Sequence, residues 1–315
     1  MMAKPEILEI VDVHPGTTAE LEEAYTVHKL WLADDADAFL ARVGPGVRGI
    51  ATNGIAGTKG VPLAALPKLE IVGVFGVGVD AVDLATARSK GVHVTNTPDV
   101  LTEGVAELGM ALLLDVARCV TRNDRWVRQG RWPKEGDPPL AWSLTGRRLG
   151  ILGLGRIGRR VAEMASAFGM QIAYCGRSRR ADVDYAYYDD PAKLAAAVDC
   201  LVVSCVGGPT TAGLVSREVI EALGPKGWLI SIARGSVVDE AALVDALVSG
   251  RLGAAGLDVF AKEPQVPAAL LKLDNVVLQP HQGSASEETR GAMGRLMLDN
   301  LAAHFAGRPL LTPVT

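Results

Sequence analysis

The turn at residues 149–158, LGILGLGRIG, limits this chain to few folds. Gly153, Gly155 and Gly158 stand in GxGxxG spacing at the end of an apolar run, and the residues that follow, up to Phe168, are apolar at helical spacing. In a strand, turn and helix of this kind the first glycine allows the tight turn, the second lets the backbone approach a pyrophosphate, and the third lets the helix pack on the strand. The helix N-terminus offers free N–H groups to the phosphates. The turn therefore predicts a dinucleotide-binding domain.

The stretch YCGRSRR at residues 174–180 indicates which dinucleotide is bound. An NAD site normally places Asp or Glu about 20 residues past the glycines, where it binds the ribose 2′-hydroxyl. This chain instead has Gly176 followed by Arg177, Ser178, Arg179 and Arg180. Guanidinium groups give a 2′-phosphate charge-assisted partners, and no carboxylate repels it. The stretch predicts NADP, with NAD as the less favoured cofactor; the alternative is a solvated basic turn.

Strand and helix patterns alternate along the 315 residues, a length that suits two domains. Before residue 99 we expect four strands and two helices, over residues 17–31 and 82–91. A long apolar pattern from Val100 to Gln129 predicts a buried helix, and residues 130–146 predict a loop. Six strands with intervening helices follow, with Asp239 as an N-cap and Gly250 as a helix stop. The last helix, of about six turns, is expected to return to the first domain.

The predicted fold class is α/β, with two doubly wound, Rossmann-like parallel-sheet domains around a cleft. We expect the first domain to be discontinuous, with residues 1–99 and 286–315 forming a substrate-binding domain. Residues 100–285 form the NAD(P)-binding domain, and the two crossings form a hinge.

Composition narrows the partners and the compartment. The net charge of −4 gives no basic field, so we expect no nucleic-acid partner. The N-terminus lacks a signal-peptide pattern, and no apolar run approaches the roughly 18 residues of a membrane span. Four scattered cysteines have no metal-site spacing and are expected to be buried thiols in a reducing compartment. We therefore expect a cytoplasmic protein with no membrane partner and no metal.

Polar residues that follow the strands are the candidates for chemistry, because ligands lie beyond the carboxyl ends of strands in such sheets. They are Arg234 after WLISIA, Asp258 in GAAGLDVF, Glu263 just beyond, His281 after NVVLQP, and the turn FGVGVD after LEIV. Reduction of a ketone needs a proton donor, a cation for a neighbouring carboxylate, and a nicotinamide at one face. The alternatives are a structural histidine, an exposed charge at Glu263 and a capping role for Asp258.

At these residues the sequence resembles the D-isomer-specific 2-hydroxyacid dehydrogenases, in particular their glyoxylate/hydroxypyruvate reductase and hydroxyphenylpyruvate reductase branch. The resemblance covers nearly the whole chain and is carried by LEIVGVFGVGVDAVDL, VTNTPDVLTEGVAELGMALLL, RQGRW, LGILGLGRIGRRVA, LISIARGSVVDEAALVDAL, GAAGLDVFAKEP and LQPHQGSAS. It implies NADP-dependent reduction of small 2-keto acids to D-2-hydroxy acids. Glyoxylate, hydroxypyruvate, 2-ketogluconate and aryl pyruvates remain open as substrates.

The resemblance also implies residue roles. His281 would be the general acid in reduction, Glu263 would hydrogen-bond its imidazole, and Arg234 would bind the substrate carboxylate and polarise the keto oxygen. The backbone of Val77 and Gly78 would hold the carboxylate. Arg156 and Ile157 would lie at the pyrophosphate, residues 177–179 at the 2′-phosphate, Pro209 and Ala233 at the ribose and nicotinamide, and Asp258 and Gly283 at the nicotinamide end. The expected cofactor-binding set is Gly153, Gly155, Arg156, Ile157, Gly158, Arg177, Ser178, Arg179, Cys205, Pro209, Ala233, Asp258 and Gly283.

Two segments depart from the family pattern, and other functions stay open. CVGGPTTAG places Gly207 and Gly208 beside the cofactor, and HQGSAS has Gln282, which either contacts substrate or faces away, and Gly283. A dinucleotide-sensing, corepressor-like binding protein without turnover is the alternative from another class. Phosphoglycerate and formate dehydrogenases are weaker fits. The resemblance implies a homodimer, with the helix after Val100 and the tryptophan-containing loop as candidate contacts.

Overall fold

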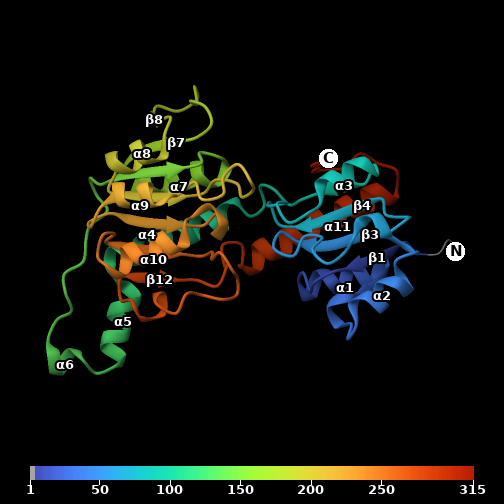
Figure 1. The fold of residues 1–315 in the computed structure, drawn as a ribbon, viewed down its shortest axis with the longest axis horizontal. Helices are drawn as coiled ribbons and strands as arrows, with labels where there is room; N and C mark the ends of the chain where they lie inside the picture. Colours follow the sequence, from blue (N-terminus) through green and yellow to red (C-terminus); the bar gives the residue numbers. More distant parts are fainter. Residues whose placement is uncertain (1–3) are drawn as a thin grey trace. The chain divides into compact units, whose positions relative to one another are not determined.

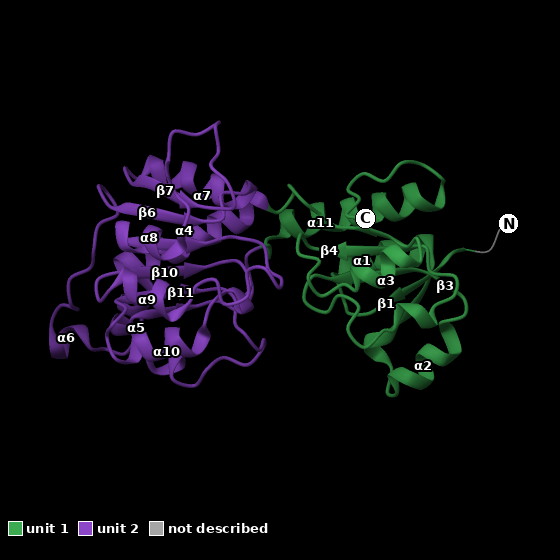
Figure 2. Cartoon of the chain, turned by 45° about the horizontal axis from the view of Figure 1, so that its top comes forward, with its two compact units in different colours: residues 1–101, 284–315 green, residues 102–283 purple. Residues whose placement is uncertain are grey.

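The computed structural model describes residues 4–315, and the chain divides into two compact units (Figure 2). Unit 1 comprises Met1–Leu101 and Ser284–Thr315, and unit 2 comprises Thr102–Gly283. Each unit has its own sheet in which every strand pair is parallel. The predicted α/β class with two parallel-sheet domains is confirmed.

Unit 1 contains a five-stranded sheet in the order β2-β1-β3-β4-β5. The strands are β1 Glu6–Glu9, β2 Thr26–Lys29, β3 Val47–Asn53, β4 Ile71–Phe75 and β5 His93–Thr95, and the helices are α1 Pro15–Ala24, α2 Ala36–Val43, α3 Leu84–Ser89 and α11 Glu287–Phe305, with short 3₁₀ turns at Leu30–Leu32 and Leu63–Ala65. Helix α11, late in the sequence, packs on β4 and α1 (Figure 1). Strand β4 is buried along its whole length, as expected for a parallel strand with both faces covered.

The helix predicted over residues 17–31 is wrong in its second half, because α1 ends at Ala24 and β2 follows. Tyr25 adopts an extended conformation and places its ring 5.6 Å from that of Phe305. The next residues pair in parallel with β1, and His28 Nε2 lies 2.8 Å from Glu6 Oε2. Pairing at the sheet edge therefore overrides a helical pattern that contained β-branched Thr26 and Val27.

Unit 2 contains a seven-stranded sheet in the order β12-β11-β10-β9-β6-β7-β8. The strands are β6 Arg148–Leu152, β7 Gln171–Cys175, β8 Ala186–Tyr188, β9 Cys200–Val203, β10 Trp228–Ser231, β11 Ala254–Leu257 and β12 Val276–Leu278. The helices are α4 Thr102–Arg118, α5 Val120–Arg128, α6 Trp132–Glu135, α7 Arg156–Ala167, α8 Pro191–Ala197, α9 Arg217–Leu223 and α10 Glu240–Val248, with 3₁₀ turns at Gly235–Val237 and Leu270–Lys272. Helices α4 and α7 pack together, as do α8 and α9, and α9 and α10.

Two features of unit 2 differ from the sequence prediction. The sheet has a seventh strand, β8, which pairs with β7 at the edge and was missed because it has only three residues and none of them is buried. The long helix expected up to Gln129 breaks at Cys119, whose φ of 54° is left-handed. Asp115 accepts a hydrogen bond from Thr121 N across this break, so α4 and α5 are separate helices.

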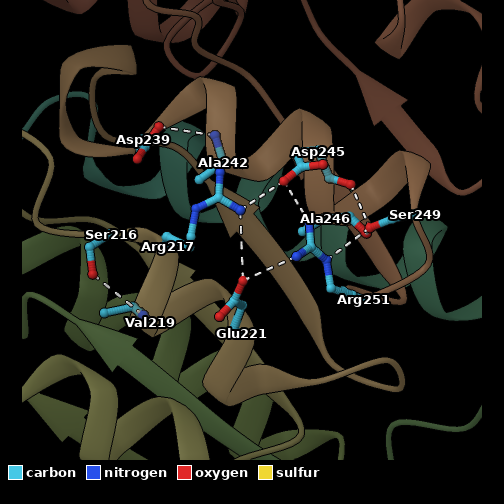
Figure 3. Close-up of polar contacts among 10 residues, drawn as sticks. All are labelled: Ser216, Arg217, Val219, Glu221, Asp239, Ala242, Asp245, Ala246, Ser249 and Arg251. Atoms are coloured by element: carbon cyan, nitrogen blue, oxygen red, sulfur yellow. Dashed lines mark hydrogen bonds and ion pairs between the residues drawn. The ribbon is translucent and has the colours of Figure 1, made fainter.

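Surface charges and caps hold α9 and α10 in place (Figure 3). Asp245 accepts from Arg217 at 2.7 Å and from Arg251 at 2.5 Å, and both arginines also reach Glu221. These pairs are half exposed, so each one contributes little alone. The predicted N-cap is confirmed, because Asp239 accepts from Ala242 N at 3.0 Å.

Candidate active site

The glycine turn after β6 has the geometry that a dinucleotide needs. Gly153 has a φ of +99°, and a Cβ there would lie 2.6 Å from Cys205 Cα. A Cβ at Gly158 would lie 2.2 Å from Gly153 O, so any side chain would separate the helix from the turn. A Cβ at Gly155 would meet nothing within 4 Å. The first and third glycines therefore serve packing, whereas the second leaves open space at the start of α7.

The open space adjoins the exposed N-terminus of α7. Gly155 is the N-cap, and Arg156, the first helical residue, is exposed, whereas Ile157 is half-buried. Free N–H groups at such a terminus attract phosphate oxygens. The other predicted cofactor residues follow neighbouring strands: half-buried Cys205 and exposed Pro209 after β9, and buried Ala233 after β10.

The arginine turn, residues 176–180, begins directly after β7, and Arg177, Ser178, Arg179 and Arg180 are exposed. Within residues 4–315, no carboxylate pairs with Arg177 or Arg179. The backbone of the turn is held by two tyrosines that the sequence analysis did not single out. Tyr174 Oη accepts from Arg180 N at 2.6 Å, and Tyr187 Oη donates to Gly176 O at 3.3 Å. Because Tyr187 lies on the unpredicted strand β8, only the structure could show this contact.

His281 and Glu263 form a hydrogen-bonded pair after β12 and β11. His281 Nδ1 lies 2.8 Å from Glu263 Oε2, and Glu263 Oε1 accepts from Phe260 N at 3.0 Å. Their side chains are 26% and 19% exposed, so the pair is largely shielded from water. Nε2 of the imidazole is then the nitrogen left to face a ligand.

Burial and charge oppose each other at Glu263. Burial is the largest single influence and raises the pKa of its carboxyl, whereas the hydrogen bonds from His281 and Phe260 lower it. The positive charges of His281 and Arg234 add to this effect, and the pKa lies below its ordinary value. Glu263 is therefore ionised at neutral pH and can stabilise a protonated imidazole.

Arg234 is brought near this pair by a close backbone approach. It is half-buried after β10, and its Nη1 donates to Ala233 O at 2.9 Å. A Cβ at the next residue, Gly235, would lie 2.0 Å from Phe260 C and O. Only glycine at this position allows the turn that follows β10 to lie against the segment that carries Glu263.

Asp258 holds the loop that carries His281. This carboxylate is 2% exposed, and its oxygens accept from Gln282 N at 2.6 Å and Gly283 N at 2.9 Å. Its backbone carbonyl accepts from His281 N, and His281 has a left-handed φ of 56°. Burial raises the pKa of the Asp258 carboxyl, although the two N–H groups act in the opposite direction. The direct contacts of Asp258 are therefore those of a loop clamp, and its predicted contact with nicotinamide stays a prediction.

In unit 1 the predicted carboxylate-binding turn follows β4. Gly76 has a φ of +148° and donates to Thr97 Oγ1 at 3.0 Å, while Asn96 Nδ2 donates to Val77 O at 2.8 Å. These bonds fix the turn from the end of β5. Over the described part of the chain, the N–H groups of Val77 and Gly78 have no protein acceptor, so they are available to an anion.

The departures from the family pattern have local explanations. The Gln282 amide donates to Pro280 O at 3.0 Å, so this side chain folds back on its own loop. In the glycine pair after β9, Gly208 has a φ of +130°, and Thr211 Oγ1 donates to Val206 O at 2.7 Å. That bond gives the segment a defined turn despite its two glycines.

Two features of the described residues concern metal binding and membrane insertion. No group of three or more His, Cys, Asp or Glu side chains in residues 4–315 could hold a metal ion. No helix in the same range is long and apolar enough to cross a membrane.

All four cysteines are unpaired. Burial raises the pKa of Cys175 and of Cys205 to about 11, so both are protonated thiols at neutral pH.

Comparison with known proteins identifies the family. Residues 110–283 match the NAD binding domain of the D-isomer specific 2-hydroxyacid dehydrogenases. The chain is 50% identical over 295 residues to hydroxyphenylpyruvate reductase from Plectranthus scutellarioides, covering 94% of each chain. It is 42% identical to 2-ketogluconate reductase from Gluconobacter oxydans over the full length of both.

A solved structure gives the same result. The NADPH-dependent glyoxylate/hydroxypyruvate reductase from Sinorhizobium meliloti, in complex with NADP and malonate, superposes with a TM-score of 0.91 at 45% identity. The match covers 99% of this chain and 97% of that one. The chain therefore belongs to the D-isomer-specific 2-hydroxyacid dehydrogenase family.

Proposed function

We propose that this protein reduces small 2-keto acids to D-2-hydroxy acids with NADPH. The observation that carries the proposal is the His281–Glu263 pair, with Arg234 nearby, beyond the carboxyl ends of the strands of unit 2. That edge is where ligands bind in doubly wound sheets. The relatives named as hydroxyphenylpyruvate, 2-ketogluconate and glyoxylate/hydroxypyruvate reductases support this reaction class.

NADP fits the cofactor residues better than NAD. The S. meliloti relative holds NADP, and the exposed guanidinium groups of Arg177 and Arg179 suit a 2′-phosphate. The open space at Gly155 and the N-terminus of α7 suit the pyrophosphate. Ser178, Ile157, Cys205, Pro209, Ala233, Asp258 and Gly283 complete the proposed cofactor-binding set.

When bound, NADPH supplies the hydride, and the residues of this chain handle the substrate and the proton. Arg234 binds the carboxylate and polarises the keto oxygen, where negative charge develops. The N–H groups of Val77 and Gly78 hold the carboxylate. His281 donates its proton to the keto oxygen, and Glu263 stabilises the imidazolium and fixes the ring.

The test of this assignment uses a second His–Glu pair as its control. His281→Gln is expected to lower kcat about 10²- to 10⁴-fold while NADPH binding is kept, because general acid catalysis contributes that much. His28→Gln alters the matching pair with Glu6 in unit 1, also 2.8 Å apart, and is expected to leave kcat unchanged. Near-normal turnover by the His281 variant would refute the mechanism, and binding of NADPH without turnover by the wild type would favour the dinucleotide sensor.

We further propose that the protein is a cytoplasmic homodimer. The support is a group of exposed apolar side chains on α5 and the segment that follows, Val120, Val127, Trp132, Leu140 and Trp142, of which Leu140 is 96% exposed. Large exposed apolar groups in one segment are typical of an interface.

The four unpaired cysteines agree with a reducing compartment. Unit 1 would be the substrate-binding domain and unit 2 the NADP-binding domain.

A further inference from the structure

The turn after β4, at residues 76–78, is held by two residues that follow β5. Gly76 O accepts from Thr97 N at 2.9 Å. Val77 O accepts from Asn96 Nδ2 at 2.8 Å. A trans peptide is planar, so its N–H group points away from its carbonyl. The first bond therefore fixes the direction of the Val77 N–H, and the second fixes that of the Gly78 N–H. Of these two bonds, only the second uses a side chain.

Asn96 is held in turn by Thr312, which lies far along the sequence but in the same unit. Thr312 Oγ1 donates to Asn96 O at 2.6 Å, and Asn96 N donates to Thr312 O at 3.4 Å. A threonine hydroxyl has one proton, so the bond to Asn96 uses its whole donor capacity. The position of Asn96, and with it the contact of its amide with Val77 O, therefore depends on Thr312.

Thr312 is fixed by Asn300, a fully buried residue of α11. Asn300 Nδ2 donates to Thr312 Oγ1 and to Leu296 O, both at 2.8 Å. Asn300 Oδ1 accepts from Leu311 N at 3.0 Å and from Thr312 N at 3.1 Å. A side-chain amide has two N–H donors and an oxygen with two lone pairs, so all of its hydrogen-bonding capacity is used here. The buried amide therefore holds Leu311 and Thr312 in one place.

Thr315 makes a comparable contact outside this hydrogen-bond path, which runs from Asn300 through Thr312 and Asn96 to Val77. Thr315 Oγ1 accepts from Val94 N at 2.9 Å and donates to Val92 O at 3.4 Å. These bonds attach Thr315 to β5 and to the residue before it, and neither involves the turn at residues 76–78. Loss of the Thr315 hydroxyl would therefore loosen the same segment without breaking the hydrogen-bond path.

We propose that this hydrogen-bond path orients the Gly78 N–H group toward the substrate carboxylate. Its positioning residues are Asn300, Thr312 and Asn96. The proposal rests on the proposed function, which places the carboxylate at the N–H groups of Val77 and Gly78. A hydrogen bond weakens steeply when its donor turns away from the acceptor. The path therefore acts on the affinity for the keto acid, whereas NADPH binding and proton donation belong to residues of unit 2.

Five variants test the path. Asn96→Ala removes the donor to Val77 O, Thr312→Val removes the hydroxyl and nearly keeps the shape, and Thr312→Ser keeps the hydroxyl. Asn96→Ala combined with Thr312→Val tests whether the two residues act in series. Thr315→Val is the control, because it removes a hydroxyl from the same segment outside the path. For each variant we would measure kcat and KM for glyoxylate and hydroxypyruvate at saturating NADPH, together with the NADPH Kd and the Tm.

Asn96→Ala is expected to raise KM for both keto acids about tenfold, as for a weakened hydrogen bond to a charged group. The kcat and the NADPH Kd should stay unchanged, because the carboxylate is bound equally in the ground state and the transition state. Thr312→Val should raise KM by a smaller factor, and Thr312→Ser should match the wild type. The combined variant should match Asn96→Ala, because residues of one hydrogen-bond network are not additive. Thr315→Val should leave KM unchanged.

An unchanged KM in Asn96→Ala would overturn the proposal. An equal rise in KM in Thr315→Val, or additive effects in the combined variant, would also overturn it, because either result would show general loosening of the segment. A fall in kcat or in NADPH affinity in place of the KM effect would overturn it as well. A wild-type protein that turns over neither glyoxylate nor hydroxypyruvate would overturn the proposed function itself, and this proposal with it.

Discussion

Replacing Glu263 by glutamine removes one charge beside His281 and keeps the shape of the side chain. The carboxylate accepts from Phe260 N at 3.0 Å and lies 2.8 Å from His281 Nδ1. The amide oxygen of the glutamine can replace only some of these hydrogen bonds. A hydrogen bond to a charged group contributes about 1.5–3 kcal/mol, and about 1.4 kcal/mol corresponds to tenfold in rate. We therefore expect kcat for hydroxypyruvate to fall roughly 10- to 100-fold.

Steady-state kinetics with hydroxypyruvate tests the prediction, with the NADPH Kd measured by fluorescence. Glu240→Gln is the matched control, because Glu240 accepts from Ala261 N at 2.9 Å and so holds the same segment without contacting His281. A kcat of the Glu263 variant equal to that of this control would refute the prediction. A parallel loss of NADPH binding would point instead to a structural role.

Three further predictions follow from the same geometry. Gly155→Ala should fold normally, because its Cβ meets no protein atom, but should lose NADPH affinity. Gly158→Ala should lower Tm, because its Cβ would lie 2.2 Å from the carbonyl oxygen of Gly153. Calorimetry and NADPH titration distinguish the two variants. Arg177→Ala combined with Arg179→Ala should raise KM for NADPH about 100-fold and leave KM for NADH unchanged in steady-state assays. An equal rise in the KM values for NADPH and NADH would contradict this prediction. The carboxyl pKa of Glu263 is lowered by folding, so the stability it contributes is complete above its ordinary value of 4.5 and is lost as pH falls through the lower folded value. Urea unfolding should therefore show wild type more stable than Glu263→Gln near neutral pH, with the difference vanishing in acid.

Local patterns predicted much of the fold. The glycine turn was recognisable because Gly153, Gly155 and Gly158 each have a separate expected role. The structure shows the close contacts at Gly153 and Gly158 and open space at Gly155. Strands β2 and β8 were missed because both are short, lie at sheet edges and have no buried residue, so pairing decides their conformation. Chain order alone could not show this.

The site was predictable where strand ends carry distinctive residues, such as Glu263 and His281. Contacts that depend on folding were not predictable. The bond from Arg180 N to the Tyr174 hydroxyl needs the turn to close, and the return of the Gln282 amide to Pro280 O depends on the loop conformation. These contacts have no sequence spacing by which they could be recognised.

The most direct test of the central claim is initial-rate oxidation of NADPH and of NADH by the purified protein, with glyoxylate, hydroxypyruvate, 2-ketogluconate, pyruvate and phenylpyruvate. We predict turnover with a marked preference for NADPH. Preference for NADH would show that the arginine turn is a solvated surface feature, and NADPH binding without turnover of any keto acid would contradict the assignment as a reductase.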